Sequence, residues 1–133
     1  MARAGDTYTI TLKKSHVKWG DFRYTHSRGT VYGEGYIPIP AKCARAFNLR
    51  NQNGVVVDTL GLNLFNCRSK DGFFDDVVRT QGCSKAGYVH AKQFASDGNL
   101  KGLGDWFVHV GAAVGDRVKV TWVSSTDIVI EKL

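Results

Sequence analysis

Hydrophobic and polar side chains alternate in two stretches, one near each end of the chain. Residues 8–12 alternate with the period of a half-buried strand. Residues 117–123 alternate in the same way, a Ser-Ser-Thr turn follows, and residues 127–130 return as the partner strand. In this hairpin we expect three side chains to face the core: Val118, Val120 and Trp122.

Between these stretches, aromatic and β-branched residues predict a strand over 30–39. Pro40 suits the first turn of a helix, so we expect a helix over 41–49. Its apolar face would carry Cys43, Ala44 and Phe47, and its polar face Lys42 and Arg45.

The middle of the chain predicts shorter elements. We expect strands over 55–57 and 60–64, a turn over 69–72, an extended segment over 87–90, and short helices over 91–95 and 105–110. Residues 73–87 have no clear period. The pattern therefore favours one domain over 1–133, mainly β with two or three short helices, folded as a closed or partly open barrel.

The composition is that of an ordinary globular protein. The chain has 133 residues, 43% of them hydrophobic and 23% charged, which is enough to build one self-sufficient core. Residues 1–6 are too short and too polar for a signal peptide, and no apolar run approaches about 20 residues. We therefore expect an intracellular protein, cytoplasmic or, in a eukaryote, nuclear.

The three cysteines predict no metal site. Cys43, Cys67 and Cys83 form no Cys-x-x-Cys pair, and no histidine is spaced to complete a zinc site. We expect reduced, structural thiols and no cofactor.

Charge is distributed unevenly along the chain. Residues 1–50 hold nine basic and three acidic side chains, whereas residues 51–133 hold nine of each, so the net charge of +6 belongs to the first 50 residues. Such asymmetry is typical of a surface that binds a polyanion. A solvated face without a partner is the alternative.

The segment 13–28 concentrates this charge, with five Lys or Arg, two His and three aromatic residues against one acid. Lys and Arg neutralise phosphates, and Arg can also pair with a guanine edge. Trp19 and Phe22 are expected to anchor the segment to the barrel. The candidate nucleic-acid contacts are Lys13, Lys14, Lys18, Arg23, Tyr24, His26, Ser27 and Arg28.

A second candidate cluster surrounds the turn expected after residue 64. It comprises Asn63, Asn66, Arg68 and Lys70, with Asp71 beside them. Asn and Arg pair well with adenine and guanine edges, although Asn is also a common turn former. Both interpretations stay open, as they do for Lys42 and Arg45.

Enzymatic motifs are missing from the sequence. It contains no nucleophile elbow, phosphate-binding glycine loop or His-Glu-x-x-His motif. Asp71, Asp75 and Asp76 could bind Mg²⁺ in a small nuclease, but no Glu-Lys pair has matching spacing. We therefore expect no catalytic residues and no enzymatic activity in this chain.

One segment resembles the entry of known DNA-binding pseudobarrels. Tyr-Ile-Pro-Ile-Pro at 36–40, followed by the expected helix, is similar to the plant B-three transcription-factor domain and to the effector-DNA-binding domains of type II restriction endonucleases. Trp-Phe-Val at 106–108 and the Gly-Asp turn before the strand at 117 also resemble that family. The similarity spans most of residues 7–130. A Gly-Asp turn before an alternating strand also occurs in bacterial swapped-hairpin transcription factors, which remain an alternative.

The resemblance implies a seven-stranded open pseudobarrel whose two arms grip the major groove of double-stranded DNA. The first arm would be 13–28 and the second about 63–71, which coincide with the two clusters identified from composition. The first arm is longer than the family pattern, so its individual contacts are less defined. Any nuclease activity would belong to a partner domain or chain. A small nuclease, a protein-interaction module with a basic arm, and RNA binding are the alternatives.

Overall fold

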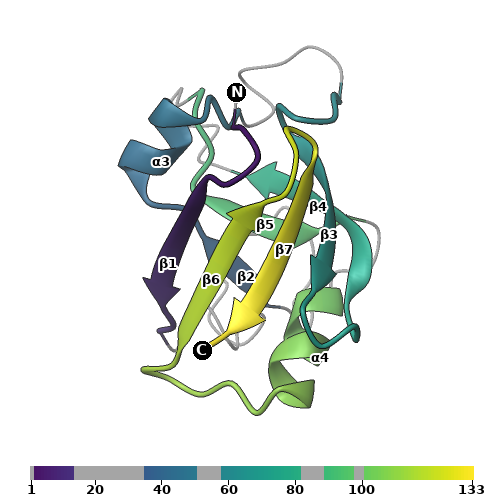
Figure 1. Cartoon of the computed structure of the whole chain (residues 1–133). Coiled ribbons are helices and arrows are strands. Elements are labelled where there is room, and N and C mark those ends of the chain that lie inside the picture. The colour runs from purple at the N-terminus through teal and green to yellow at the C-terminus, as the bar shows by residue number, and fades with distance from the viewer. Residues whose placement is uncertain (1, 14–34, 51–57, 82–88, 98–100) are drawn as a thin grey trace, which may run out of the picture.

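The computed structural model describes residues 2–13, 35–50, 58–81, 89–97 and 101–133. These residues form seven strands and two short helices (Figure 1). In chain order they are β1 (Thr7–Thr11), β2 (Tyr36–Pro38), α3 (Ala41–Ala46), β3 (Leu64–Ser69), β4 (Asp75–Gln81), β5 (Gln93–Ser96), α4 (Gly102–His109), β6 (Arg117–Trp122) and β7 (Asp127–Lys132).

All seven strands belong to one sheet, which curls until it nearly closes into a barrel. Their order is β1-β6-β7-β3-β4-β5-β2, and every neighbouring pair is antiparallel except β3 and β7. The seam lies between β1 and β2, the two edges of the sheet. Across it, the hydroxyl of Tyr8 donates a hydrogen bond to the carbonyl oxygen of Pro38 at 3.0 Å. The prediction of a mainly β, seven-stranded open barrel is confirmed.

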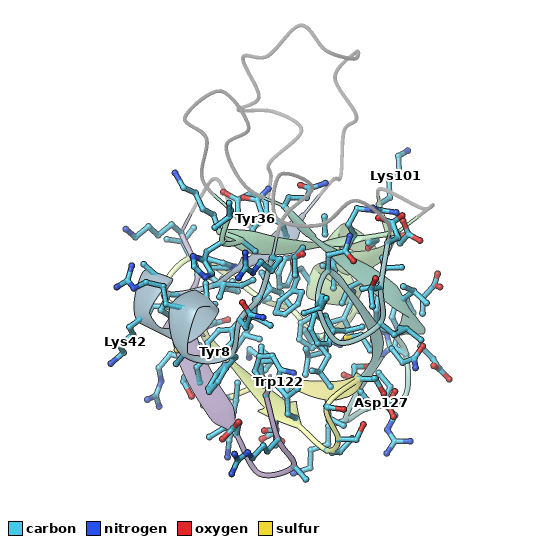
Figure 2. All side chains as sticks on the ribbon, turned by 90° about the horizontal axis from the view of Figure 1, so that it is seen from above. Tyr8, Tyr36, Lys42, Lys101, Trp122 and Asp127 are labelled. Carbon is cyan, nitrogen blue, oxygen red and sulfur yellow. The ribbon has the colours of Figure 1, made fainter. Side chains whose placement is uncertain are left out.

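Trp122, at the end of β6, packs among aromatic rings in the core. It is fully buried, and the rings of Phe47, Phe65 and Phe94 lie 5.1, 6.1 and 6.3 Å from it between centroids. Figure 2 shows Trp122 inside the molecule, whereas Lys42 points outward from its rim. Because side chains alternate along a strand, Val118 and Val120 face the same interior, as predicted.

The two helices lie at opposite ends of the barrel (Figure 1). On α3, Cys43 and Ala44 are buried while Lys42 and Arg45 are exposed, as the apolar and polar faces predicted. The helix is shorter than expected, because it ends at Ala46.

On α4, Leu103, Trp106 and Phe107 are buried. A Cβ atom at Gly35 would lie 2.9 Å from Cδ2 of Phe107, so this position requires glycine for the chain to enter β2. Neither α3 nor α4, the helices of the described residues, has the length and apolar character that crossing a bilayer requires.

Two predicted elements were wrong. Residues 60–63 form a turn instead of a strand, in which Thr59 O accepts the backbone N–H of Leu62, and β3 begins at Leu64. The helix expected over 91–95 is replaced by β5, since β2 and β4 on its two sides satisfy its backbone groups. The segment left unassigned after residue 72 contains β4. The strand expected at 55–57 and the start of that expected at 30–39 lie outside the described residues.

Candidate nucleic-acid interface

The strand directions bring the residues that border the first predicted arm and the turn that ends the second to one end of the barrel. β1, β3, β5 and β7 finish at this end, and β2, β4 and β6 begin there. Lys13 and Gly35, which flank the segment 14–34, therefore lie at the same end as the turn between β3 and β4. We call it the α4 end, and the opposite one the α3 end (Figure 1).

Most of the first cluster lies outside the described residues. This applies to Lys14, Lys18, Arg23, Tyr24, His26, Ser27 and Arg28, and to the proposed anchors Trp19 and Phe22. Lys13 is described, and it is exposed directly after β1. The prediction for this cluster therefore stays a prediction. The segment that carries the cluster begins at the α4 end.

The second cluster lies partly on the outer wall of the barrel. Asn66 and Arg68 are exposed on β3, where alternation turns both side chains away from the core. Asn66 Nδ2 donates to Asp127 Oδ1 at 2.7 Å. Lys70, in the turn after β3, forms an ion pair with Glu131 at 2.9 Å. Arg68 makes no hydrogen bond or ion pair with any described residue, and it lies directly opposite Asp75 on β4.

Asn63 does not belong to this surface. It is fully buried, its Oδ1 accepts the N–H of Thr59 at 2.7 Å, and its Nδ2 donates to Asp58 at 2.8 Å. The interpretation of Asn63 as a turn former is therefore the correct one, and its prediction as a nucleic-acid contact is dropped.

Asn66 and Arg68 share a shallow pocket on the outer wall. Its volume is about 230 Å³, and Asp75, Val123 and Asp127 also line it. Asn66 and Arg68, the two exposed contacts predicted on β3, thus line the same surface depression as the carboxylates of Asp75 and Asp127.

The turn that follows β3 is compact and docked against α4. Asp71 Oδ1 accepts hydrogen bonds from Ser69 Oγ and from the N–H of Phe73, both at 2.8 Å, and its Oδ2 accepts the indole N–H of Trp106 at 2.9 Å. Although partial desolvation acts in the opposite direction, these donors lower the pKa of Asp71. The second arm is therefore a short, fixed turn.

This geometry does not support the alternative metal-dependent nuclease. Asp71 uses both carboxylate oxygens inside the turn, and Asp76 Oδ1 accepts the N–H of Val77 at 2.7 Å. Among the described residues, no three His, Cys, Asp or Glu side chains are grouped so that they could hold a metal ion.

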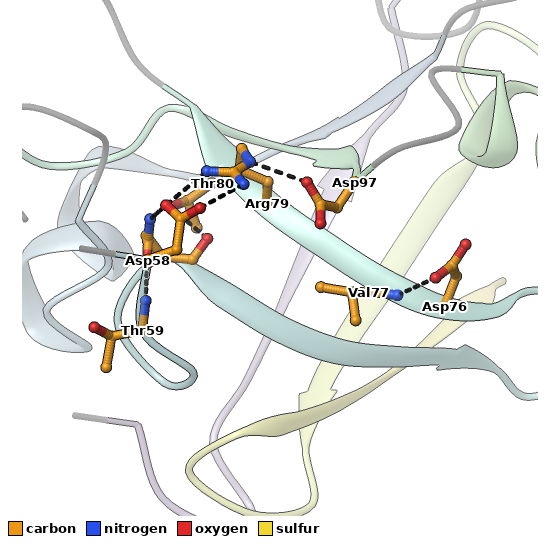
Figure 3. Close-up of polar contacts among 8 residues, drawn as sticks. Asp58, Thr59, Asp76, Val77, Arg79, Thr80 and Asp97 are labelled. Atoms are coloured by element: carbon orange, nitrogen blue, oxygen red, sulfur yellow. Dashed lines mark hydrogen bonds and ion pairs between the residues drawn. The ribbon is translucent and has the colours of Figure 1, made fainter.

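A polar network that the sequence did not indicate ties the start of β3 to β4 and β5 (Figure 3). Arg79 donates to both oxygens of Asp58, at 2.8 and 2.7 Å, and through Nε to Asp97 at 3.1 Å. These hydrogen bonds from Arg79, with that from Asn63, lower the pKa of Asp58 to about 2. The network fixes the residues that border 51–57 and 98–100. We assign it a positioning role, because its charged groups are paired with each other.

Arg50, directly after the helix expected over 41–49, was not among the candidate site residues. Arg50 Nε donates to Asn48 Oδ1 at 2.7 Å. Arg50 pairs with His90 before β5 and with Leu62 before β3, so it lies at the α3 end, as do Lys42 and Arg45 of α3. The three cations are therefore at the end of the barrel opposite Lys13 and the β3–β4 turn. The signal in the sequence was an Asn, a residue type that adopts the left-handed conformation more readily than most, two residues before an Arg.

Comparison with known proteins adds no assignment. No protein-family model matches the chain, and neither a curated protein nor a solved structure gives a significant match.

Proposed function

We propose that this protein binds double-stranded DNA, with sequence preference, through the α4 end of its barrel. The proposal is supported by the position of the residues that border the first predicted arm, which lie at the same end of the barrel as the turn that ends the second. Lys13 and Gly35, which border the basic segment, lie at the same end as the turn that holds Lys70. Two loops that leave one end of a small barrel can bracket a major groove, which is about 12 Å wide.

The charge distribution supports the same end. The basic segment 13–28 begins where β1 stops, and it carries five Lys or Arg against one acid. Lys13, Lys14 and Lys18 would neutralise phosphates, which provides affinity without sequence information.

Sequence preference would come from side chains that reach base edges. Arg23 and Arg28 can each donate two hydrogen bonds to guanine, and Tyr24, His26 and Ser27 can bond bases or phosphates. On the barrel wall, Arg68 and Asn66 have the chemistry for guanine and adenine edges. Asn66 must then exchange its hydrogen bond with Asp127 for one with a base.

The proposed activity is binding. Where the biological system includes DNA cleavage, we assign it to a partner domain or chain, since Asp71, the acid of the β3–β4 turn, uses its carboxylate to hold that turn.

A binding selection on random duplex oligonucleotides at low salt tests the proposal. We expect enrichment of a defined sequence. Arg23→Ala and Arg28→Ala should each lower the affinity for the selected duplex by about 1–3 kcal/mol where the arginine reads a base. Arg3→Ala is the matched control, because Arg3 is exposed near the α3 end. Absence of duplex binding at low salt, with retention of single-stranded RNA or an acidic protein, would overturn the proposal.

A further inference from the structure

The α3 end carries cations that lack acidic neighbours in sequence. Residues 35–50 contain Lys42, Arg45 and Arg50 and no Asp or Glu. Lys42 and Arg45 are exposed on α3, and Figure 2 shows Lys42 directed away from the barrel. Within the described part of the chain, none of the three forms an ion pair.

Both the backbone and the side chain of Arg50 are fixed by hydrogen bonds. Its backbone N–H donates to Leu62 O at 2.9 Å, and its carbonyl oxygen accepts a hydrogen bond from Thr80 Oγ1. Its Nε donates to Asn48 Oδ1, and Asn48 has a φ of 54°. Both Nη groups have no partner among the described residues. A planar guanidinium fixed through Nε presents its remaining donors in the geometry that phosphate oxygens accept.

The surface has the character of a phosphate-binding site more than that of a protein interface. Protein interfaces depend on aromatic or apolar anchors. None of the large exposed hydrophobic side chains of the described residues lies within 35–50, although exposed Leu60 and Val89 are close in sequence to the residues that pair with Arg50. The exposed residues beside Lys42 and Arg45 on α3 are Ala41 and Ala46. Small neighbours allow a nucleic-acid backbone to approach the cations closely.

We propose that Lys42, Arg45 and Arg50 form a second, sequence-independent phosphate-binding surface, so that one molecule holds two DNA duplexes. The inference rests on the proposed function for the first duplex. The second follows from the topology: Lys13 and the β3–β4 turn lie at the α4 end, and α3 lies at the other. A straight duplex that contacts Lys13 and this turn therefore lies at the end of the barrel opposite α3.

A bridging experiment with the full chain tests this inference. One duplex with the selected sequence carries a fluorescence donor, and a second duplex of random sequence carries an acceptor. Wild-type protein should raise energy transfer between them at low salt. Lys42→Ala/Arg45→Ala should abolish the transfer while leaving affinity for the donor duplex within about twofold. It should also reduce the salt slope of the bridging step by about 2, because each of the two cations neutralises one phosphate.

One further variant controls for the loss of charge, a second tests the fixed position of Arg50, and thermal unfolding controls for folding. Lys119→Ala removes a cation from an exposed position in the middle of β6 and should retain bridging. Asn48→Gly keeps all charges and suits the positive φ, but it releases Arg50, so bridging should weaken by about 3- to 10-fold. Thermal unfolding should be unchanged in the α3 variant because both side chains are exposed.

The outcomes separate the two proposals. If the wild type binds the donor duplex without bridging, or if the α3 variant bridges as well as the wild type, the second surface is refuted and the proposed function stands. Loss of donor-duplex affinity in the α3 variant, without bridging in the wild type, would mean that α3 contacts the same duplex, which also refutes it. Failure to bind any duplex refutes both.

Discussion

At the scale of single residues, the two largest buried side chains differ in the state of their indole N–H groups. Trp106 and Trp122 are both fully buried. The N–H of Trp106 donates to Asp71, whereas that of Trp122 has no acceptor among the described residues. An unpaired buried donor costs free energy that a phenylalanine would not incur.

We therefore predict that Trp122→Phe destabilises the protein less than Trp106→Phe. Both substitutions remove ring volume, but only Trp106→Phe also removes a hydrogen bond. Trp122→Ala should cost about 3–5 kcal/mol, because it leaves a cavity among four aromatic rings. Urea unfolding at neutral pH measures all three values, and a larger cost for Trp122→Phe than for Trp106→Phe would contradict the assignment.

Asp58 gives a prediction about pH. Its pKa is about 2 in the folded protein because Arg79 and Asn63 donate to its carboxylate, and its ordinary value is 3.8. A depressed pKa contributes stability that is present above the ordinary value and is lost as pH falls toward the folded one. The difference in unfolding free energy between wild type and Asp58→Asn should therefore be constant above about pH 5 and shrink between about pH 4 and 2. Urea unfolding across this range measures it, and a constant difference throughout would disprove the role of Arg79.

At the scale of elements, the β3–β4 turn and α4 act as one unit. Asp71 connects them through hydrogen bonds from Ser69, Phe73 and Trp106. The ring of Phe73 also stacks on His109, with centroids 4.0 Å apart and planes 10° apart. A turn fixed at this many points presents Lys70 in a defined place at the α4 end.

Asp71→Ala should therefore destabilise the protein by about 1–3 kcal/mol, since it leaves the buried indole N–H of Trp106 without an acceptor. Asp75→Ala is the matched control, because Asp75 is exposed at the start of β4. Chemical denaturation compares the two variants. Equal effects would show that the contact between turn and helix contributes nothing measurable.

At the scale of the whole molecule, the fold decides which charged side chains are paired, in addition to the uneven distribution of charge along the sequence. In the described residues, many acids are matched locally: Asp58 and Asp97 with Arg79, Glu131 with Lys70, and Asp116 with Lys132. The cations of α3 and Arg68 are not matched in this way. Among the described residues, unmatched positive charge thus lies on α3 and on the outer face of β3.

This arrangement predicts a steep dependence of DNA affinity on salt. Up to five phosphates would be neutralised by the basic segment 13–28, so the slope of log K against log salt for one specific duplex should approach about −4 to −5. Replacing Lys13, Lys14 and Lys18 together with Ala should make that slope shallower by about 3. A mobility-shift titration between about 50 and 300 mM salt measures both, and a flat response in the wild type would contradict binding through these cations.

The alternating hairpin at the C-terminus was predictable from sequence because each of its strands has one buried and one exposed face. β5 was not, since Phe94, Ala95 and Ser96 are all buried, and a short segment without alternation does not distinguish strand from helix. The role of Asn63 was equally undetermined. Its amide became structural through contacts with Thr59 and Asp58, which the residue type alone does not specify.

By itself, the sequence determined the fold class, the outward faces of α3 and the concentration of charge before residue 50, because period and composition are local properties. Tertiary structure alone decided which ends of the barrel the charged segments share. Strand order depends on pairings between residues far apart in the chain, such as β1 with β6 and β2 with β5. Those pairings set the residues that border the basic segment at the α4 end, and they put Lys42, Arg45 and Arg50 at the other.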